Sequence, residues 1–450
     1  MLHKVSIFVL LAIIFSVSGQ NSNKPPDKPS IKVSCLLAGR LVDPASEKIR
    51  DNMVIIIEGE RIKMVGTRSE TKVPPDADVI DLSGATLLPG LIDCHTHLGA
   101  RADHYDDIYD FKDTPFNSAF AAVIHARKTL EAGFTTVRDV GSAPFLAVDL
   151  RNAINEGFLA GPRVVASGPG ISITGGHGDL NSYSPQTRVT MFPEERDYQI
   201  ADGADQIRHV VRAHAKYGVD LIKICATGGV LSRGDRPGAP QFTLEELRVA
   251  AETAHMAGRK IAAHAHGAEG IKNAILAGID SIEHASLIDD EGIRLAKEHG
   301  TYLVMDIYND DYLISEAPKF GLSTEKLEKE KLVGRLQREN FEKAFKAGAK
   351  MAFGTDAGVY PHGDNARQFA YMVKYGMTPF QAIRSATSSA ADLLGLGKDI
   401  GAIEPGKSAD IIAVESDPLK DVRSLEHVMF VMKEGKVFKD ARPAPATTSR

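Results

Sequence analysis

The sequence of 450 residues contains no tryptophan and only three cysteines. The absence of tryptophan excludes a carbohydrate-binding platform made of Trp side chains. The cysteines, Cys35, Cys94 and Cys225, are odd in number and widely spaced, so they do not suggest a disulfide framework. We interpret Cys225 as a packing residue, although its closeness in sequence to Lys223 also allows a place beside a functional site.

Positive net charge and long apolar runs are also missing. The net charge of -6 argues against a nucleic-acid partner, which needs a basic face. The apolar run Val5–Val17 follows Lys4 and ends in small residues, as in a secretory signal, and it is too short to span a bilayer comfortably. We predict a signal peptide over residues 1–19, export to the periplasm or outside the cell, and no stable membrane insertion after cleavage. An uncleaved anchor is the alternative.

Short strand-like segments occur near both ends of the chain. Residues 20–30 contain three prolines and are predicted to be a linker, and residues 31–88 alternate apolar strands with turn residues. The same pattern returns over residues 401–441, and residues 442–450 are expected to be a disordered tail. The simplest arrangement pairs the two regions in one small β-sandwich domain.

Between these regions, residues 89–400 alternate short apolar strands with amphipathic helices, which is typical of βα units. The predicted helices include residues 118–132, 204–217, 244–257 and 325–347. Eight strands are predicted, at residues 91–93, 135–139, 163–166, 220–224, 260–263, 280–283, 302–306 and 351–354. The fold class is therefore predicted as α/β, with a (β/α)8 TIM barrel inserted into the β-sandwich domain.

Metal-binding side chains follow several of these strands, and the carboxyl ends of barrel strands converge on one site. His95 and His97 lie two residues apart, so a strand places them on one face, and His264 and His266 repeat this spacing. A single pair of this kind is weak, because histidines at strand ends are common. The complete set of strand-end candidates is stronger, and it consists of His95, His97, Lys223, His264, His266, His284 and Asp356.

These residue types suit a pair of divalent metal ions. Imidazole and carboxylate ligands favour zinc and neighbouring metals. The amine of Lys223 cannot bind a metal as an ammonium ion, but its carbamate with carbon dioxide is an anion that can bridge two metals. Two ions at about 3.5–4 Å share a water and supply hydroxide at neutral pH. Asp356 can accept the proton of that water and pass it to the leaving group.

The order of these motifs resembles the amidohydrolase superfamily, in the form with two metals and a carboxylated lysine. The resemblance rests on Pro89 to His97, Lys223, the spaced His264 and His284, Phe353 to Asp356, and the late segment Ile403 to Asp410. The segments Gly175 to Asp179, Ile222 to Val230 and Ala263 to Gly267 resemble the Xaa-Pro and Xaa-Arg dipeptidases, a prolidase-like group that includes ochratoxinase-type amidases. Such enzymes release the C-terminal amino acid from a dipeptide or an N-acyl amino acid.

The resemblance implies a role for each candidate residue. His95, His97 and Asp356 would hold the first metal, His264 and His284 the second, and carboxylated Lys223 would bridge two ions, expected to be Zn²⁺. His177 and His266 would polarise the scissile carbonyl or position the substrate, and Val230 and Leu231 would line the side-chain pocket. The expected catalytic residues are thus Asp356, His266 and His177, and the expected reaction is attack of bimetal-bound hydroxide on the amide.

Several alternatives stay open at this point. A lactonase or cyclic-amide hydrolase would use the same site, although Gly267 stands where single-metal imidazolone hydrolases carry an acid. His266 could replace His264 as ligand, and we favour His264 because the predicted strand ends there. A non-catalytic scaffold would be expected to have lost ligands. The role of the loop Ser232–Gly238 is open, with Arg233 or Arg236 as a candidate for a substrate carboxylate, and the chain is a possible homo-oligomer with a small-molecule or dipeptide substrate.

Overall fold

The structure is a computed structural model that describes residues 32–191 and 195–442. The predicted signal peptide, the linker and all but the first residue of the predicted tail lie outside these ranges. That first residue, Arg442, donates a 2.9 Å hydrogen bond to the backbone carbonyl of Asp81. Within the described ranges no helix combines the length and the apolar character needed to cross a membrane.

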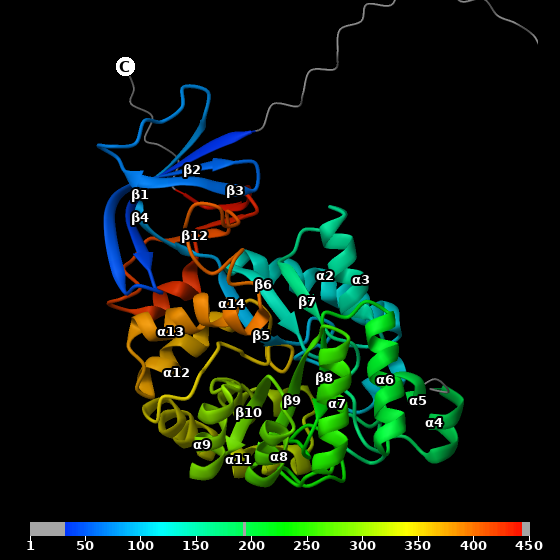
Figure 1. Ribbon diagram of the computed structural model, residues 1–450. Coiled ribbons are helices and arrows are strands. Elements are labelled where there is room, and N and C mark those ends of the chain that lie inside the picture. Colours follow the sequence, from blue (N-terminus) through cyan, green and yellow to red (C-terminus); the bar gives the residue numbers. More distant parts are fainter. Residues whose placement is uncertain (1–31, 192–194, 443–450) are drawn as a thin grey trace, which may run out of the picture.

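Strands from both chain ends meet in one sheet (Figure 1). In this sheet β4 pairs with β1 in parallel and with β12 in antiparallel fashion. In spatial order the seven strands are β14 (Lys436–Asp440), β13 (Phe430–Lys433), β12 (Ile411–Val414), β4 (Asp78–Pro89), β1 (Val33–Asp43), β2 (Lys48–Glu58) and β3 (Arg61–Thr67). The predicted pairing of the two ends is present, but the sandwich is not confirmed, because hydrogen bonds run without interruption through all seven strands as a single sheet.

The middle of the chain forms two parallel sheets whose strands match seven of the predicted ones to within a few residues. Each strand is largely buried, as expected where helices cover a parallel sheet. One sheet holds β5 (Leu91–Thr96), β6 (Phe134–Asp139) and β7 (Arg163–Ala166), and the other holds β8 (Leu221–Cys225), β9 (Lys260–Gly267), β10 (Ser281–Leu287) and β11 (Tyr302–Val304).

The predicted eighth strand, residues 351–354, makes only isolated contacts in place of a ladder. Met351 bridges to Leu303 of β11, and the amide of Cys94 in β5 donates to the carbonyl of Phe353. Ile171 and Ile224 form a further parallel bridge between the regions of β7 and β8. In the described part of the chain the strand ladders therefore form two parallel sheets joined by isolated bridges, and no continuous ladder runs through all eight predicted strands.

Helices cover the outside of the parallel sheets, as Figure 1 shows for α6 to α9. Their starts follow from local sequence: Thr243 and Glu246, for example, form a capping box at the start of α7. The helices are α1 (Tyr109–Lys112), α2 (Pro115–Glu131), α3 (Leu146–Asn155), α4 (Pro185–Met191), α5 (Glu195–Tyr198), α6 (Ala204–Lys216), α7 (Leu244–Met256), α8 (Ala268–Leu276), α9 (Asp290–His299), α10 (Asn309–Ser315), α11 (Thr324–Lys346), α12 (Gln368–Lys374), α13 (Pro379–Ser385) and α14 (Ser388–Leu394). Within the described residues, 3-10 helices span Ala317–Phe320, Asn365–Arg367 and Val422–His427.

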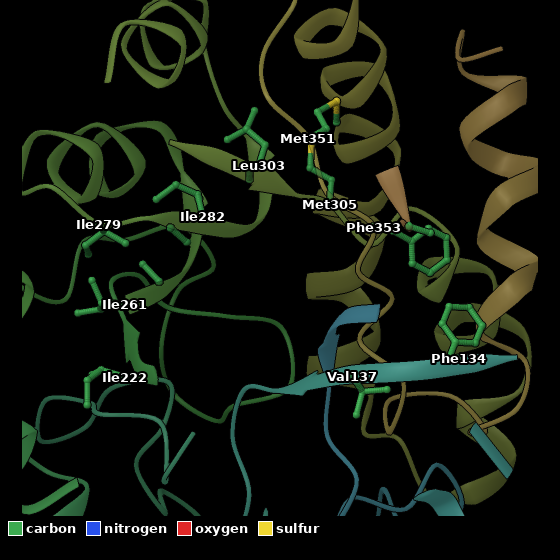
Figure 2. Close-up of a cluster of buried hydrophobic side chains, with 14 of the residues drawn as sticks. Phe134, Val137, Ile222, Ile261, Ile279, Ile282, Leu303, Met305, Met351 and Phe353 are labelled. Atoms are coloured by element: carbon green, nitrogen blue, oxygen red, sulfur yellow. The ribbon is translucent and has the colours of Figure 1, made fainter. Parts of the chain in front are cut away.

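The main hydrophobic core draws on both parallel sheets. Figure 2 shows Phe134 and Val137 of β6 in the same cluster as Ile222 of β8 and Ile261 of β9. Met351 and Phe353, from the segment predicted as the eighth strand, are buried in this cluster as well. Packing thus holds this segment against the strands that carry the candidate residues.

Gly90 connects the terminal sheet to the parallel sheets. It lies between β4 and β5, and a Cβ atom at this position would lie 2.1 Å from Oγ1 of Thr135. Only glycine lets the two chain segments approach so closely. The strand that ends in the two histidines therefore continues directly from β4.

One buried histidine on α6 gives a stability prediction. His214 is fully buried, its Nε2 atom hydrogen-bonds to the carbonyl of Tyr198 at 2.6 Å, and burial lowers its pKa to about 4. An unfolded histidine has a pKa of about 6.5, so below that pH the unfolded chain gains a proton that the folded chain does not. Above pH ~6.5 we expect the titration of His214 to cause no change in the free energy of unfolding. As the pH falls from 6.5 toward 4, protonation of His214 in the unfolded chain should lower the free energy of unfolding by at most about 3 kcal/mol.

Urea unfolding of the wild type and of His214→Gln across this pH range measures the effect. The variant should lose less stability than the wild type on acidification, because glutamine does not titrate. Equal losses in the two proteins would assign the acid sensitivity to other groups.

Candidate metal centre and active site

The structure brings the predicted site residues into one cavity of about 290 Å³. The cavity lies toward the carboxyl ends of the parallel strands, because β5 ends just before His97, and Lys223, His266 and His284 lie within the last four residues of β8, β9 and β10. The lining includes all ten predicted residues: His95, His97, His177, Lys223, Val230, Leu231, His264, His266, His284 and Asp356.

The first group lies around Asp356. Its Oδ1 atom is 3.4 Å from Nε2 of His95 and 3.2 Å from Nε2 of His97. The Nδ1 atom of His97 hydrogen-bonds to the carbonyl of Gly141 at 2.7 Å, which leaves Nε2 free to face the carboxylate. Ligand atoms of His95, His284 and Asp356 all lie within 4.8 Å of one another, so these residues can surround one metal ion.

The second group contains three histidines. Ligand atoms of His264, His266 and His284 lie within 4.8 Å of one another. The Nδ1 atom of His266 is 2.7 Å from Oγ of Ser286, whereas Nε2 of His264 is buried without a hydrogen-bond partner. The strand β9 runs on to Gly267, so the position of its end does not separate the two histidines as predicted. The buried, unsatisfied nitrogen of His264 supports this residue as a ligand, as predicted.

Buried ring nitrogens without hydrogen-bond partners indicate that this set of side chains can hold a metal ion. Both ring nitrogens of His95 and Nε2 of His264 are buried without a hydrogen bond, which is costly unless another ligand satisfies them. Imidazole nitrogens with one carboxylate are the ligands that zinc and related ions prefer. These clusters can therefore hold divalent metal.

Lys223 reaches the cavity from β8. It is 4% exposed, and burial lowers the pKa of its amine. A buried ammonium is unfavourable without compensation, so burial increases the share of neutral amine. Cys225, two residues later, also lines the cavity, and burial raises the pKa of its thiol to about 11.

Buried polar residues hold the histidines in place. Nδ1 of His95 lies 3.0 Å from Oε2 of Glu283, close enough for an electrostatic contact but without the alignment of a hydrogen bond, and the other oxygen of Glu283 accepts a 2.7 Å hydrogen bond from Arg138. Nδ1 of His284 lies 2.8 Å from Asp306, which also accepts a 2.8 Å hydrogen bond from Gln337. Such partners orient a ligand ring and raise its basicity.

The sequence analysis did not identify these supporting residues. Glu283 directly precedes His284 and Asp306 ends a predicted strand, so their positions were a usable signal. Arg138 and Gln337 gave no such signal, because their roles depend on packing between distant segments.

The backbone is strained at two of the candidate ligands. His284 has a φ of 69° and Asp356 a φ of 59°, in the left-handed region that few non-glycine residues adopt. Strain of this kind costs of order 1–3 kcal/mol and concentrates at functional sites. The strained backbone at these two residues therefore lowers local stability but places both side chains in the cavity.

His177 faces the second group. Its ring stacks on that of His264 with centroids 4.0 Å apart, and its Nδ1 atom is 2.8 Å from Oγ of Ser232. Ser232 in turn donates to Asp235 at 2.6 Å. Burial lowers the pKa of His177 to about 4, so the ring is neutral at physiological pH.

The loop that contains Ser232 is tied to neighbouring elements. Lys329 of α11 lies 3.1 Å from Asp235, and Arg233 forms an ion pair with Asp107. Arg233 is therefore already paired with a carboxylate of this chain, and Arg236 does not line the metal-site cavity. Neither observation favours the predicted contact of these arginines with a substrate carboxylate.

The geometry defines a metal-binding site at the ends of parallel strands, and comparison with known proteins gives its class. The amidohydrolase family model matches residues 86–438, and the chain belongs to this family. The ochratoxinase of Aspergillus niger is 34% identical over 429 residues, which cover 91% of this chain and 87% of that protein.

Solved structures agree with this assignment. A Xaa-Pro dipeptidase with methionine bound in its active site matches with a TM-score of 0.85 and 39% identity, over 91% of this chain and all of that chain. The crystal structure of the A. niger ochratoxinase matches with a TM-score of 0.80 and 31% identity, over 91% of this chain and 96% of that chain. The predicted resemblance to the superfamily and to this group is thereby confirmed.

Proposed function

We propose that the protein is a metal-dependent amide hydrolase that releases the C-terminal amino acid from dipeptides or N-acyl amino acids. The observation that carries the proposal is the convergence of six histidines, Lys223 and Asp356 on one cavity. The similarity to an ochratoxinase and a Xaa-Pro dipeptidase supports amide substrates of this kind. The broader statement, a hydrolase of the amidohydrolase family, follows from the family itself.

In this proposal two metal ions, expected to be zinc, are held by the two groups of ligands and by Lys223. The neutral amine of Lys223 would add to carbon dioxide, forming an N–C bond and releasing one proton, and the resulting carbamate would bridge the groups. Bound metals supply an acidified water and polarise the substrate carbonyl. We also propose that the two parallel sheets are halves of one (β/α)8 barrel, a fold with its sites at this end of the strands.

Side chains of this protein would transfer protons, position the substrate carbonyl and line the pocket for the substrate side chain. Asp356 can take a proton from the attacking water and return it to the leaving nitrogen, because its Oδ1 atom already lies between His95 and His97. His177 carries its single ring hydrogen on Nδ1, because Ser232 donates its own hydrogen to Asp235, so the free Nε2 atom can accept a hydrogen bond from the substrate and position it. His266 can polarise the substrate carbonyl, with Ser286 holding its ring. Val230 and Leu231 provide apolar surface for a substrate side chain.

Metal removal and a matched substrate panel test the proposal. We expect zinc-loaded protein to cleave some members of a panel of Xaa-Pro, Xaa-Arg and Xaa-Phe dipeptides and N-acyl amino acids, with simple lactones as comparison. Chelation should abolish turnover and added zinc should restore it, because the buried histidines then lack the ion that completes them. Amino acid release is measured by chromatography and bound metal by elemental analysis.

Turnover of amides that survives complete metal removal would contradict the metal-dependent proposal. Turnover of lactones with none of any amide would keep the metal site but assign another substrate class. Protein that binds no metal and cleaves nothing would favour a scaffold.

A further inference from the structure

A buried carboxyl group that metal binding does not use lies on the wall of the same cavity. Glu330 of α11 is 3% exposed and lines the cavity together with the metal-binding residues. Its carboxyl group shares a hydrogen bond with Asp310 at the start of α10. Carboxyl groups are rarely buried in such places without a cationic partner.

The cations nearby do not balance this acid. One nitrogen of Arg338 lies 3.2 Å from Asp310 and 2.7 Å from Asp311, so a single guanidinium serves two other carboxylates. The Oδ1 atom of Asp310 is nevertheless buried without a hydrogen-bond partner. Burial, together with the charge of Asp310, raises the pKa of Glu330 well above its usual value.

The packing of α11 accommodates this arrangement. A Cβ atom at Gly334 would lie 2.1 Å from Oδ1 of Asp310, so only glycine at this position of the helix leaves room for the carboxylate. Gly334 follows Glu330 by four residues and therefore lies on the same face of α11. The acid pair is thus enclosed by the fold and not placed at a free surface.

A second acceptor points to the same kind of ligand. Asn309 is 6% exposed and lines the cavity, and its Nδ2 atom donates to Asp306 and lies 3.5 Å from Asp356. These two carboxylates fix the orientation of the amide, because only its nitrogen can donate to them. The Oδ1 atom is left buried without a partner. An unpaired acceptor and a buried carboxyl in one cavity both require N–H donors.

We propose that Glu330, assisted by Oδ1 of Asn309, binds a protonated amine or guanidinium group of the substrate. This inference rests on the proposed function, and it narrows the substrate class to amides that carry a cationic group. The cation would come either from a free amino terminus or from a basic side chain. Burial disfavours the ionised form of Glu330, whereas a cation bound beside it would favour that form, and charge-assisted hydrogen bonds to the resulting carboxylate are strong. The apolar side chains of Leu313 and Val333 on the cavity wall can contact an alkyl chain beside the cation.

The test measures binding by calorimetry on zinc-loaded protein with four ligands of nearly equal shape. These are arginine, citrulline and the Nα-acetyl derivatives of both, which remove the two positive charges separately and together. We expect Nα-acetylcitrulline to bind at least about tenfold more weakly than the preferred cationic ligand. In Glu330→Gln this preference should disappear. Glutamine keeps the size of the side chain and can still donate to Asp310, so the fold should be retained.

Glu339→Gln is the matched control, because Glu339 lies on the same helix but its side chain is 57% exposed. It should bind all four ligands like the wild type. Loss of affinity on replacing arginine by citrulline would identify a basic side chain as the source of the cation, and loss on acetylation would identify the amino terminus.

Equal binding of all four ligands by the wild type, absence of binding by all four, or a preference that survives in Glu330→Gln would each overturn the inference. Amide turnover without any cation preference would leave the proposed function intact while this inference fails. A cation preference without amide turnover would support this inference while the proposed function fails.

Discussion

Replacement of Lys223 by alanine is expected to remove most of the bound metal and to lower kcat/KM by about 10³-fold or more. The side chain is almost fully buried and lines the cavity, and the proposal makes it the group that joins the two sets of ligands. Without it, His264 and His284 lose the anionic partner that would balance the second ion. A thousandfold loss corresponds to about 4 kcal/mol, within the several kcal/mol that metal ions contribute to such transition states.

Metal content and activity are measured on the same preparations, with unfolding curves to show that the variant is folded. Lys331→Ala is a suitable control, because Lys331 lies on α11 and its side chain is 48% exposed. A Lys223→Ala protein that retained two metals per chain and the wild-type rate would exclude the bridging role.

The second large effect is expected for Asp356→Asn. Asparagine keeps the shape and an oxygen that can face His95 and His97, but it cannot accept a proton from water. General acid–base catalysis contributes about 10²–10⁴-fold, so we expect kcat to decrease by about 10³-fold. Loss of the negative charge should also weaken metal binding, which is why kcat must be measured at saturating zinc.

Asp364→Asn provides the comparison, since Asp364 lies eight positions later on the chain with a side chain that is 42% exposed. It should leave both rate and metal content unchanged. If Asp356→Asn at full metal occupancy kept more than about a tenth of the wild-type kcat, proton transfer would have to be assigned to another group.

The sequence predicted the candidate site better than it predicted the fold around it. The spacing of the paired histidines predicts their orientation, because residues two apart in a strand lie on the same face. Their position at the ends of apolar strands predicts that they meet, because the ends of parallel strands converge on one site. His95 and His264 could therefore be assigned to one cavity from the sequence. The helices α6, α7 and α11 were also predicted within a few residues, since each has apolar residues at helical spacing and is followed closely by a glycine.

The remaining features depend on contacts that no local pattern contains. Arg138 and Glu283 form a buried pair across 145 residues of sequence. Gln337 reaches Asp306 only because α11 packs against β10 and α10, and Glu330 belongs to the cavity for the same reason. The terminal strands are apolar in either a sandwich or a single sheet, so composition alone did not distinguish the two.

The pairing of β4 with β12 has a consequence for synthesis on the ribosome. β4 leads directly into the strand that carries His95, but its partner β12 follows after roughly 320 residues of intervening chain. A nascent chain exposes the edge of β4 until nearly the whole protein has been made. Completion of the sheet that leads into the metal-binding strand thus waits for one of the last segments to emerge, so shortened translation products would carry every ligand and still lack the partner strand of β4.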